Sequence, residues 1–174
     1  MIWPISSYNN IIKRRNQVEN ARAAVETVLK NRYDLIPNLV ESVKQYMRYE
    51  ESTLAKITEI RNSVPRHDTS AESLQKENQL SRLLGGILVS LENYPDLKSN
   101  TNMLQLQRSI AEVEEEISAA RRAFNAAVMA YNNSVETFPS NIVGNIMGAK
   151  RMSAFEAAAN ERENPSVKNL FDAK

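Results

Sequence analysis

The sequence predicts an all-α protein, an elongated antiparallel bundle of long helices. Only 4 of its 174 residues are glycine and 6 are proline, which leaves little turn chemistry for a sheet of many strands. Apolar residues recur three and four positions apart over long stretches, which is the period of an amphipathic helix. The length fits one domain, and it is sufficient to bury a core without support from metals or disulfides.

The composition argues against several classes of function. Lys and Arg number 22 against 21 Asp and Glu, so the net charge of +1 does not favour a nucleic-acid partner. The absence of cysteine excludes disulfides and thiolate chemistry. His67 is the one histidine and lies in a polar segment, so we expect no metal site and no cofactor. We find no signal peptide and no run of 18 apolar residues that would span a membrane.

A first helix is expected from Ser6 or Ser7, either of which can cap it, to about Asn31. Its apolar stripe includes residues seven positions apart: Ile11, Val18 and Val25. The segment that follows, 32–43, predicts a sharp corner between two antiparallel helices. Asp34 can act as an N-cap there, and Pro37 would fall in the first turn of a second helix that ends near Ser63. One continuous helix kinked at Pro37 is the alternative.

A third helix is predicted after the polar loop 64–70, and it should end near Tyr94 because Pro95 follows. Gly85 and Gly86 lie in its middle, where each glycine costs roughly 1 kcal/mol relative to alanine. We therefore expect another helix to approach the pair closely, or the helix to kink there.

The fourth helix has the most regular pattern. Its apolar positions alternate three and four apart: Met103, Leu106, Ile110, Val113, Ile117, Ala120, Phe124, Ala127 and Tyr131. The acidic run 114–116 is expected to be a solvated face. A di-metal carboxylate bundle would need Glu-x-x-His pairs, and none of the predicted helices contains a histidine. Phe138 and Pro139 should end the helix.

A short apolar segment follows this helix, and the favoured interpretation is a helix that caps one end of the bundle. The alternative is an interaction patch that touches a membrane surface or a partner protein. That patch would consist of Ile142, Val143, Ile146, Met147 and Phe155.

Glu50 stands out because it continues an apolar series spaced by seven: Ile36, Val43, Ile57 and Val64. A carboxylate in such a position needs a partner. The predicted corner would bring it opposite the turn of the first helix that contains Arg15. We therefore predict a buried Arg15–Glu50 pair, the alternative being a Glu50 that points to solvent.

Three strings carry a resemblance to a known family: KNRYDLIPNLVESVKQY (30–46), LENYPDLKSN (91–100) and AARRAFNAAVMAYNNSVETFPSN (119–141). On these, the chain resembles the LemA family of bacterial membrane-associated helical proteins from about Tyr8 to Phe155. The resemblance implies four long helices in a bromodomain-like mirror variant of the up-and-down bundle. It also implies a membrane anchor immediately before Tyr8, where the given sequence begins with residues 1–5, MIWPI, so the anchor would either have been removed or be missing from this member. Residues 1–7 would be a stub left by that anchor, 8–159 the helical bundle and 160–174 a polar C-terminal tail.

No settled activity comes with the resemblance, so no residue inherits a catalytic role and we do not expect an enzyme. The leading hypothesis is a scaffold or adaptor, a rigid bundle held at the bacterial cytoplasmic membrane and contacting an unidentified protein partner. The chain as given is expected to be soluble. One alternative is a sensor module that binds a ligand or peptide in a polar gap between helices, near Gly85 and Tyr94. A pocket lined by Tyr and Asn would favour it. The other is a homo-oligomer of such rods.

Overall fold

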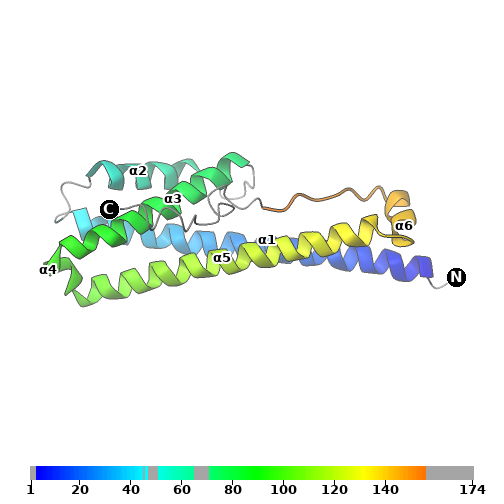
Figure 1. Cartoon of the computed structure of the whole chain (residues 1–174), viewed down its shortest axis with the longest axis horizontal. Helices are drawn as coiled ribbons and strands as arrows, with labels where there is room; N and C mark the ends of the chain where they lie inside the picture. The colour runs from blue at the N-terminus through cyan, green and yellow to red at the C-terminus, as the bar shows by residue number, and fades with distance from the viewer. Residues whose placement is uncertain (1–2, 45, 47–50, 65–70, 156–174) are drawn as a thin grey trace, which may run out of the picture.

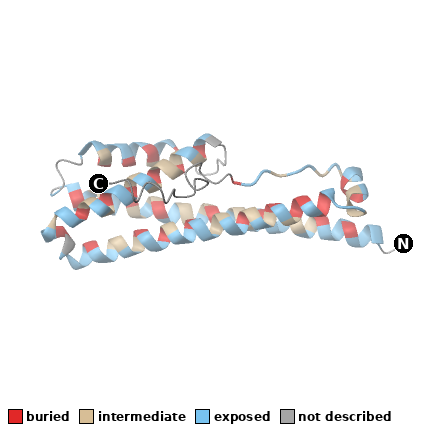
Figure 2. Cartoon of the chain, in the orientation of Figure 1, coloured by how far each residue is buried: buried red, intermediate tan, exposed pale blue. Residues whose placement is uncertain are grey.

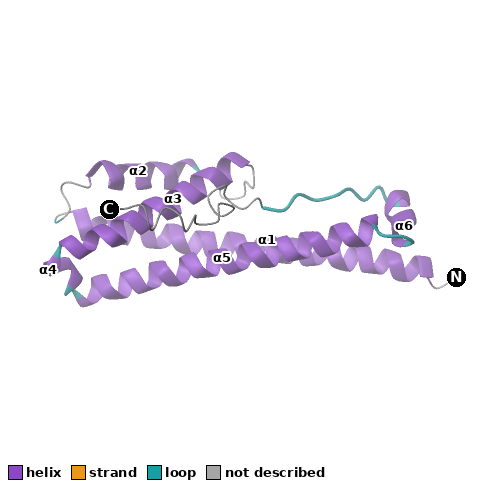
Figure 3. Cartoon of the chain, viewed as in Figure 1, coloured by secondary structure: helices purple, strands orange, loops and turns teal. Residues whose placement is uncertain are grey.

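The structure is a computed structural model that describes residues 3–44, 46, 51–64 and 71–155. All regular secondary structure in these ranges is helical, which confirms the predicted all-α class (Figure 3). The frame is an antiparallel pair of long helices, α1 (Trp3–Lys44) and α5 (Thr101–Glu136), that run the length of the molecule (Figure 1). At 1.5 Å per residue, these helices are about 63 Å and 54 Å long.

A second layer covers one half of this pair. It consists of α2 (Glu51–Ser63) and α3 (Ala71–Ser90), which lie side by side over α1 and α5 (Figure 1). A 3-10 turn, η2 (Leu91–Asn93), and the short α4 (Pro95–Lys98) then lead into α5. The core of this half takes residues from every long helix, among them Leu39, Ile57, Leu84 and Ile110. Four helices therefore share one core here.

The predicted corner at 32–43 is wrong, because α1 continues through Pro37 as one helix. Proline has no N–H to donate to the carbonyl four residues earlier, which belongs to Tyr33. Arg61 of α2 supplies the missing donor, since its Nε lies 2.9 Å from the Tyr33 carbonyl oxygen. The neighbouring helix thus offsets the main cost of an internal proline, which the sequence of α1 alone could not indicate.

Other helix boundaries are explained by local sequence signals. The helix α1 begins at Trp3 rather than near Tyr8, with Pro4 in the first turn, where an N–H is not needed. Asn100 caps α5: its Oδ1 accepts hydrogen bonds from the backbone N–H groups of Asn102 and Met103. As predicted, α5 ends just before Phe138–Pro139, which is a cis peptide.

The glycine pair of α3 does not mark a helix contact. Gly85 and Gly86 are both exposed, and a Cβ built on either would meet no atom within 4 Å. The prediction of a close helix approach is therefore wrong for the described chain. The helix α3 also continues through the pair to Ser90.

The other half of the molecule is narrower, with the α1–α5 pair covered by a short helix and an irregular segment. The helix α6 (Ser140–Ile146) folds back against the end of α5, as the capping-helix interpretation predicted. Gly148, at φ 64°, directs the chain away from α6. Residues 149–155, here called the strap, then run back along the long helices toward α3 (Figure 1).

Two asparagines of α5 hold the strap by its backbone. Asn132 donates from Nδ2 to the Met152 carbonyl and accepts at Oδ1 from the Met152 N–H, both at 2.9 Å. Asn125 makes the same pair of bonds to Phe155, at 3.1 and 2.8 Å. Seven residues of helix span about 10.5 Å. Three residues of extended chain span about 10 Å. The spacing of the asparagines therefore matches that of the strap residues they hold.

Candidate functional site

The most deeply buried charge of the described chain is Arg32, on the face of α1 that meets α3 and α5. Its side chain is 1% exposed and forms an ion pair with Glu77 of α3, a residue that is itself 3% exposed. Nη1 of Arg32 also contacts Glu114 of α5 at 3.0 Å and donates to the hydroxyl of Ser81 at 2.7 Å. Three helices are thus joined by one guanidinium, whose charge is balanced inside the protein.

The neighbouring Tyr33 extends this network toward the surface. Its hydroxyl donates a hydrogen bond to Oε1 of Glu77, while the Arg32 guanidinium meets the other carboxylate oxygen. Ser81 completes the network, since its hydroxyl donates to Oε2 of Glu114 at 2.7 Å. Glu77 therefore accepts a hydrogen bond at one oxygen and has the Arg32 cation as its ion-pair partner at the other, so its buried charge is compensated.

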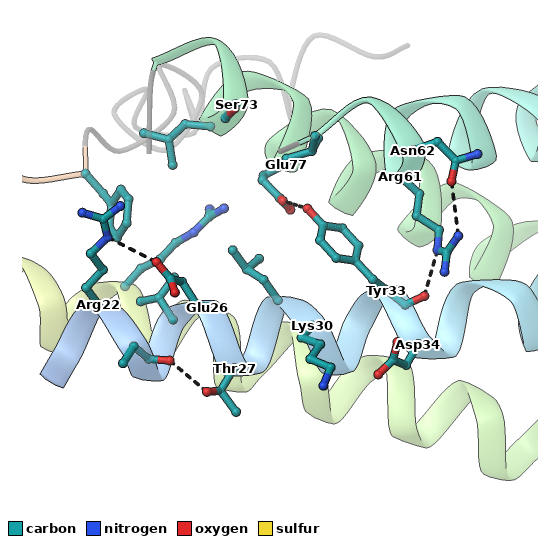
Figure 4. Close-up of a pocket in the computed structure, with 17 residues that line it drawn as sticks. Arg22, Glu26, Thr27, Lys30, Tyr33, Asp34, Arg61, Asn62, Ser73 and Glu77 are labelled. Atoms are coloured by element: carbon teal, nitrogen blue, oxygen red, sulfur yellow. Dashed lines mark hydrogen bonds and ion pairs between the residues drawn. The ribbon is translucent and has the colours of Figure 1, made fainter. Parts of the chain in front are cut away.

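A cavity of about 550 Å³ opens on the solvent side of this network (Figure 4). It lies between α1, the end of α2, the first turns of α3 and a side chain from α5. Tyr33 and Glu77 form its inner wall, and Phe155 at the end of the strap lines another side. A volume of this size falls within the range of roughly 300–1,000 Å³ typical of ligand sites.

The lining of the cavity is mixed in character. Charged side chains come from four helices, α1, α2, α3 and α5, and the apolar walls are formed by Val25, Leu29, Leu74, Val64 and Phe155. Arg121 reaches the cavity from α5, and its Nη1 donates to Oδ1 of Asn78 on α3 at 2.8 Å. At the cavity wall nearest the strap, Arg22 pairs with Glu26 at 3.2 Å. Such an arrangement can bind a molecule with both polar and apolar parts.

Burial raises the pKa of Tyr33 above its ordinary value near 10, although the guanidinium groups of Arg32, Arg121 and Arg61 act in the opposite direction. Because the folded state favours the protonated hydroxyl, the contribution of Tyr33 to stability is complete below about pH 10. That contribution is then lost as the pH rises through the folded-state pKa.

We therefore expect Tyr33→Phe to lower the free energy of unfolding by about 1 kcal/mol at pH 8, the usual value of one hydrogen bond. The difference from the parent chain should shrink above pH 10, because only the parent loses its Tyr33 contribution there. Urea unfolding at pH 8 and pH 11 measures this, with the exposed Tyr8→Phe as control. A difference that stays constant with pH would contradict the assignment.

No described group of three or more His, Cys, Asp or Glu side chains is placed to hold a metal ion. None of the described helices is both long and apolar enough to cross a membrane.

Comparison with known proteins places the chain. Residues 21–169, most of the sequence, match the model of the LemA family. The chain belongs to the LemA family. A protein LemA of Metamycoplasma hominis is 27% identical over 93% of this chain and 74% of its own length.

More distant relatives of this LemA-family chain are proteins of the magnetosome. The magnetosome protein MamQ 2 of Paramagnetospirillum magneticum is 23% identical over 86% of this chain. The magnetosome protein MamQ of Magnetospirillum gryphiswaldense is 21% identical over 85%. The match spans 64% of the length of each of these two proteins, so less than two thirds of either is represented here.

The predicted ion pair of the LemA chain cannot be placed, because Glu50 lies outside the described residues, as do His67 and the tail 160–174. The corner from which this pair was predicted is not present in the structure. Arg15 is exposed on α1, and the segment 32–43 extends the same helix instead of folding back beside it.

The five residues of the predicted interaction patch do not form one surface. Val143 and Phe155 are buried, and Met147 is half-buried. Ile142 and Ile146 of α6 are exposed at the end of the rod. Phe155 packs on Phe124 instead, with ring centroids 4.5 Å apart, next to the cavity. The exposed part of the patch is therefore the outer face of α6.

The buried network of this LemA-family protein was not predicted from the sequence, although a signal was present. The series Ile11, Val18, Val25 continues by sevens to Arg32 and Leu39, and every one of these positions is buried. The assumed corner ended the series one residue too early. Glu114 was assigned to a solvated face together with Glu115 and Glu116. Only its two neighbours are fully exposed, because Glu114 turns inward to Arg32.

Proposed function

We propose that this protein is a non-enzymatic scaffold, a rigid rod held by one end at the bacterial cytoplasmic membrane. The observation that carries the proposal is the concentration of exposed apolar side chains at the end of the rod where α1 begins. We call this the apolar end. It consists of Trp3, Ile5, Tyr8, Phe138, Ile142 and Ile146.

Three elements build the apolar end. The first turns of α1 lie beside α6, and both adjoin the turn after α5 (Figure 1). Phe138 is 79% exposed and Ile146 82% exposed, whereas the residues between them anchor α6 through the buried Val143. Figure 2 shows exposed, intermediate and buried residues together in α6. The exposed Phe side chain of the turn after α5 and the exposed Ile side chains of α6 favour an external apolar partner.

The chemistry of this end fits the interface of a bilayer. Trp and Tyr side chains favour the headgroup level, and nearby cations favour anionic lipids. Lys13 and Arg15 on α1 and Lys150 after α6 are exposed and supply such cations. The exposed Arg151 is paired with Glu136 at 3.6 Å. An anchor joined to the start of α1, as the family resemblance implies, would hold the apolar end against the membrane. The half containing α2 and α3 would then extend away from the bilayer to meet a protein partner.

Co-sedimentation of the chain with vesicles of phosphatidylcholine and phosphatidylglycerol tests the membrane contact. We expect binding that weakens at least tenfold in the triple variant Phe138→Ser, Ile142→Ser, Ile146→Ser, since each exposed apolar side chain contributes on the order of 1 kcal/mol when buried. The control removes exposed apolar side chains elsewhere, in Val89→Ser with Leu104→Ser. Equal loss in both variants would contradict the proposal. Self-association abolished by the triple variant, without vesicle binding, would favour the homo-oligomer instead.

The second candidate function is a ligand-binding module. It is favoured by the cavity next to Tyr33, whose lining includes a Tyr and an Asn, as this alternative predicts. The cavity does not lie at Gly85 and Tyr94, where the sequence had suggested a gap. A fragment screen by NMR on the full chain tests it. Fragments that shift the amide signals of cavity residues should lose binding in Leu74→Trp, a substitution that fills the cavity, and not in Val89→Trp on the exposed face of the same helix.

A further inference from the structure

The balance of charge around the cavity distinguishes it from an ordinary surface groove. Four of its lining residues are cations, Arg22, Lys30, Arg61 and Arg121, and three are acids, Glu26, Asp34 and Glu77. Two of the acids have cations of their own. Glu26 pairs with Arg22, and Glu77 pairs with Arg32, which is not part of the lining. Among the described lining residues, the cations therefore outnumber the acids by one, and Lys30 and Arg61 are the cations relevant to ligand contact.

Arg61 is held at the cavity in a way that leaves its charge uncompensated by its bonding partners. Its Nε donates to the Tyr33 carbonyl, and its Nη1 donates to Oδ1 of Asn62 at 3.2 Å. Neither acceptor carries a charge. The first bond goes to the carbonyl that Pro37 leaves without a donor in α1, and it holds the guanidinium in place at the cavity (Figure 4). Lys30 lies one turn before Asp34 on the same wall and is exposed.

We propose that this cavity binds a small organic anion that has an apolar body. The anionic group, a carboxylate or a phosphate, contacts Arg61 and Lys30. The apolar body lies against Leu29, Leu74 and Phe155. The carboxylate of Glu77 does not repel it, because Arg32 and the Tyr33 hydroxyl already bind that group.

This inference rests on the second candidate function and is independent of the membrane-held scaffold. Its ligand class follows from the two properties of the lining together. Cations alone would favour any anion, including inorganic phosphate. The apolar wall additionally favours a ligand that has an apolar group to bury against it. Partial enclosure also strengthens attraction between opposite charges relative to bulk water.

Titration of the full-length chain with 4-phenylbutanoate, followed by NMR of backbone amides, tests the proposal. The neutral comparison is 4-phenylbutan-1-ol, which has the same apolar group and a hydroxyl in place of the charge. A third ligand, 4-phenylbutyl phosphate, shows whether the cavity prefers a phosphate to a carboxylate. We expect shifts at cavity residues and a Kd for at least one anion that is fivefold or more below that of the alcohol. Raising the salt concentration should reduce this preference.

A charge reversal at the cavity should weaken the anions without affecting the fold. Lys30→Glu is expected to raise their Kd at least fivefold and to leave that of the alcohol nearly unchanged. Lys44→Glu makes the same charge change on the same helix, outside the cavity, and should have no effect. Equal binding of anions and alcohol, shifts confined to the apolar end, or no binding of either anion would overturn the proposal. Binding of neutral fragments alone would overturn the ligand class while leaving the second candidate function standing.

Discussion

Replacing Arg32 by methionine should lower the free energy of unfolding by about 3–5 kcal/mol. The substitution retains much of the side-chain volume but removes the cation that balances Glu77, which is 3% exposed and cannot turn to water. Loss of one partner of a buried ion pair typically costs this much, because the remaining charge stays desolvated. Loss of the cation should cost less at Glu114, because its side chain is 28% exposed and can be solvated. Urea unfolding at pH 7, read by circular dichroism, gives the free energy.

Two further variants separate loss of the ion pair from loss of packing. The double variant Arg32→Met, Glu77→Gln removes both charges and keeps an acceptor for the Tyr33 hydroxyl, so it should recover more than half of the loss. Arg15→Met makes the same change at an exposed position of α1 and should stay within about 0.5 kcal/mol of the parent. A cost below about 1 kcal/mol for Arg32→Met would show that the pair does not stabilise the fold. Equal cost in the single and double variants would assign the effect to packing.

The sequence predicted the parts of this fold that are determined locally. The heptad stripe from Met103 to Tyr131 placed α5 and most of its buried face, because a periodic apolar stripe needs no knowledge of its partner. Phe138–Pro139 marked its end for the same reason. The resemblance to the LemA family, carried by the strings around Pro37, Pro95 and Pro139, was confirmed by the match over residues 21–169.

Tertiary contacts account for what was missed. Pro37 predicted a helix break from its own chemistry, and the donor that permits a continuous helix is Arg61, 24 residues further along and on another element. Once that break was assumed, Arg32 fell outside the first helix and was not recognised as the next member of its buried series. The cavity was placed near Gly85 and Tyr94 for a related reason, since the convergence of Tyr33, Glu77 and Arg121 depends on how three helices pack.

The strap had no sequence signal of the usual kind, yet its two anchors do repeat. Aromatic–asparagine pairs occur seven residues apart, at Phe124–Asn125 and Tyr131–Asn132. In each pair the aromatic ring is buried in the seam with α1, and the asparagine next to it faces the strap. A periodic analysis of apolar residues detects the rings and passes over the amides. An extended segment held mainly by backbone bonds needs only a few specific side chains, here Met152 and Phe155, so it has no long periodic pattern to detect.

Removing both asparagines, in Asn125→Ala with Asn132→Ala, should release the strap and lower the free energy of unfolding by about 2–4 kcal/mol. Four hydrogen bonds of about 1 kcal/mol each are lost. The backbone of Phe155 is then no longer held in place, so its ring contact with Phe124 weakens. Hydrogen exchange should show the effect locally, with protection of the Met152 and Phe155 amides reduced at least tenfold while amides of α3 are unaffected.

Asn132→Asp separates hydrogen bonding from packing at this site. Aspartate has the shape of asparagine and still accepts from the Met152 N–H, but it has no donor for the Met152 carbonyl and places a negative charge against it. It should therefore lose protection at Met152 about as strongly as Asn132→Ala does, while Phe155 remains held by Asn125. Asn133→Ala, at the adjacent exposed position, should leave both amides protected. If the aspartate variant retained full protection, packing rather than the paired backbone bonds would fix the strap to α5.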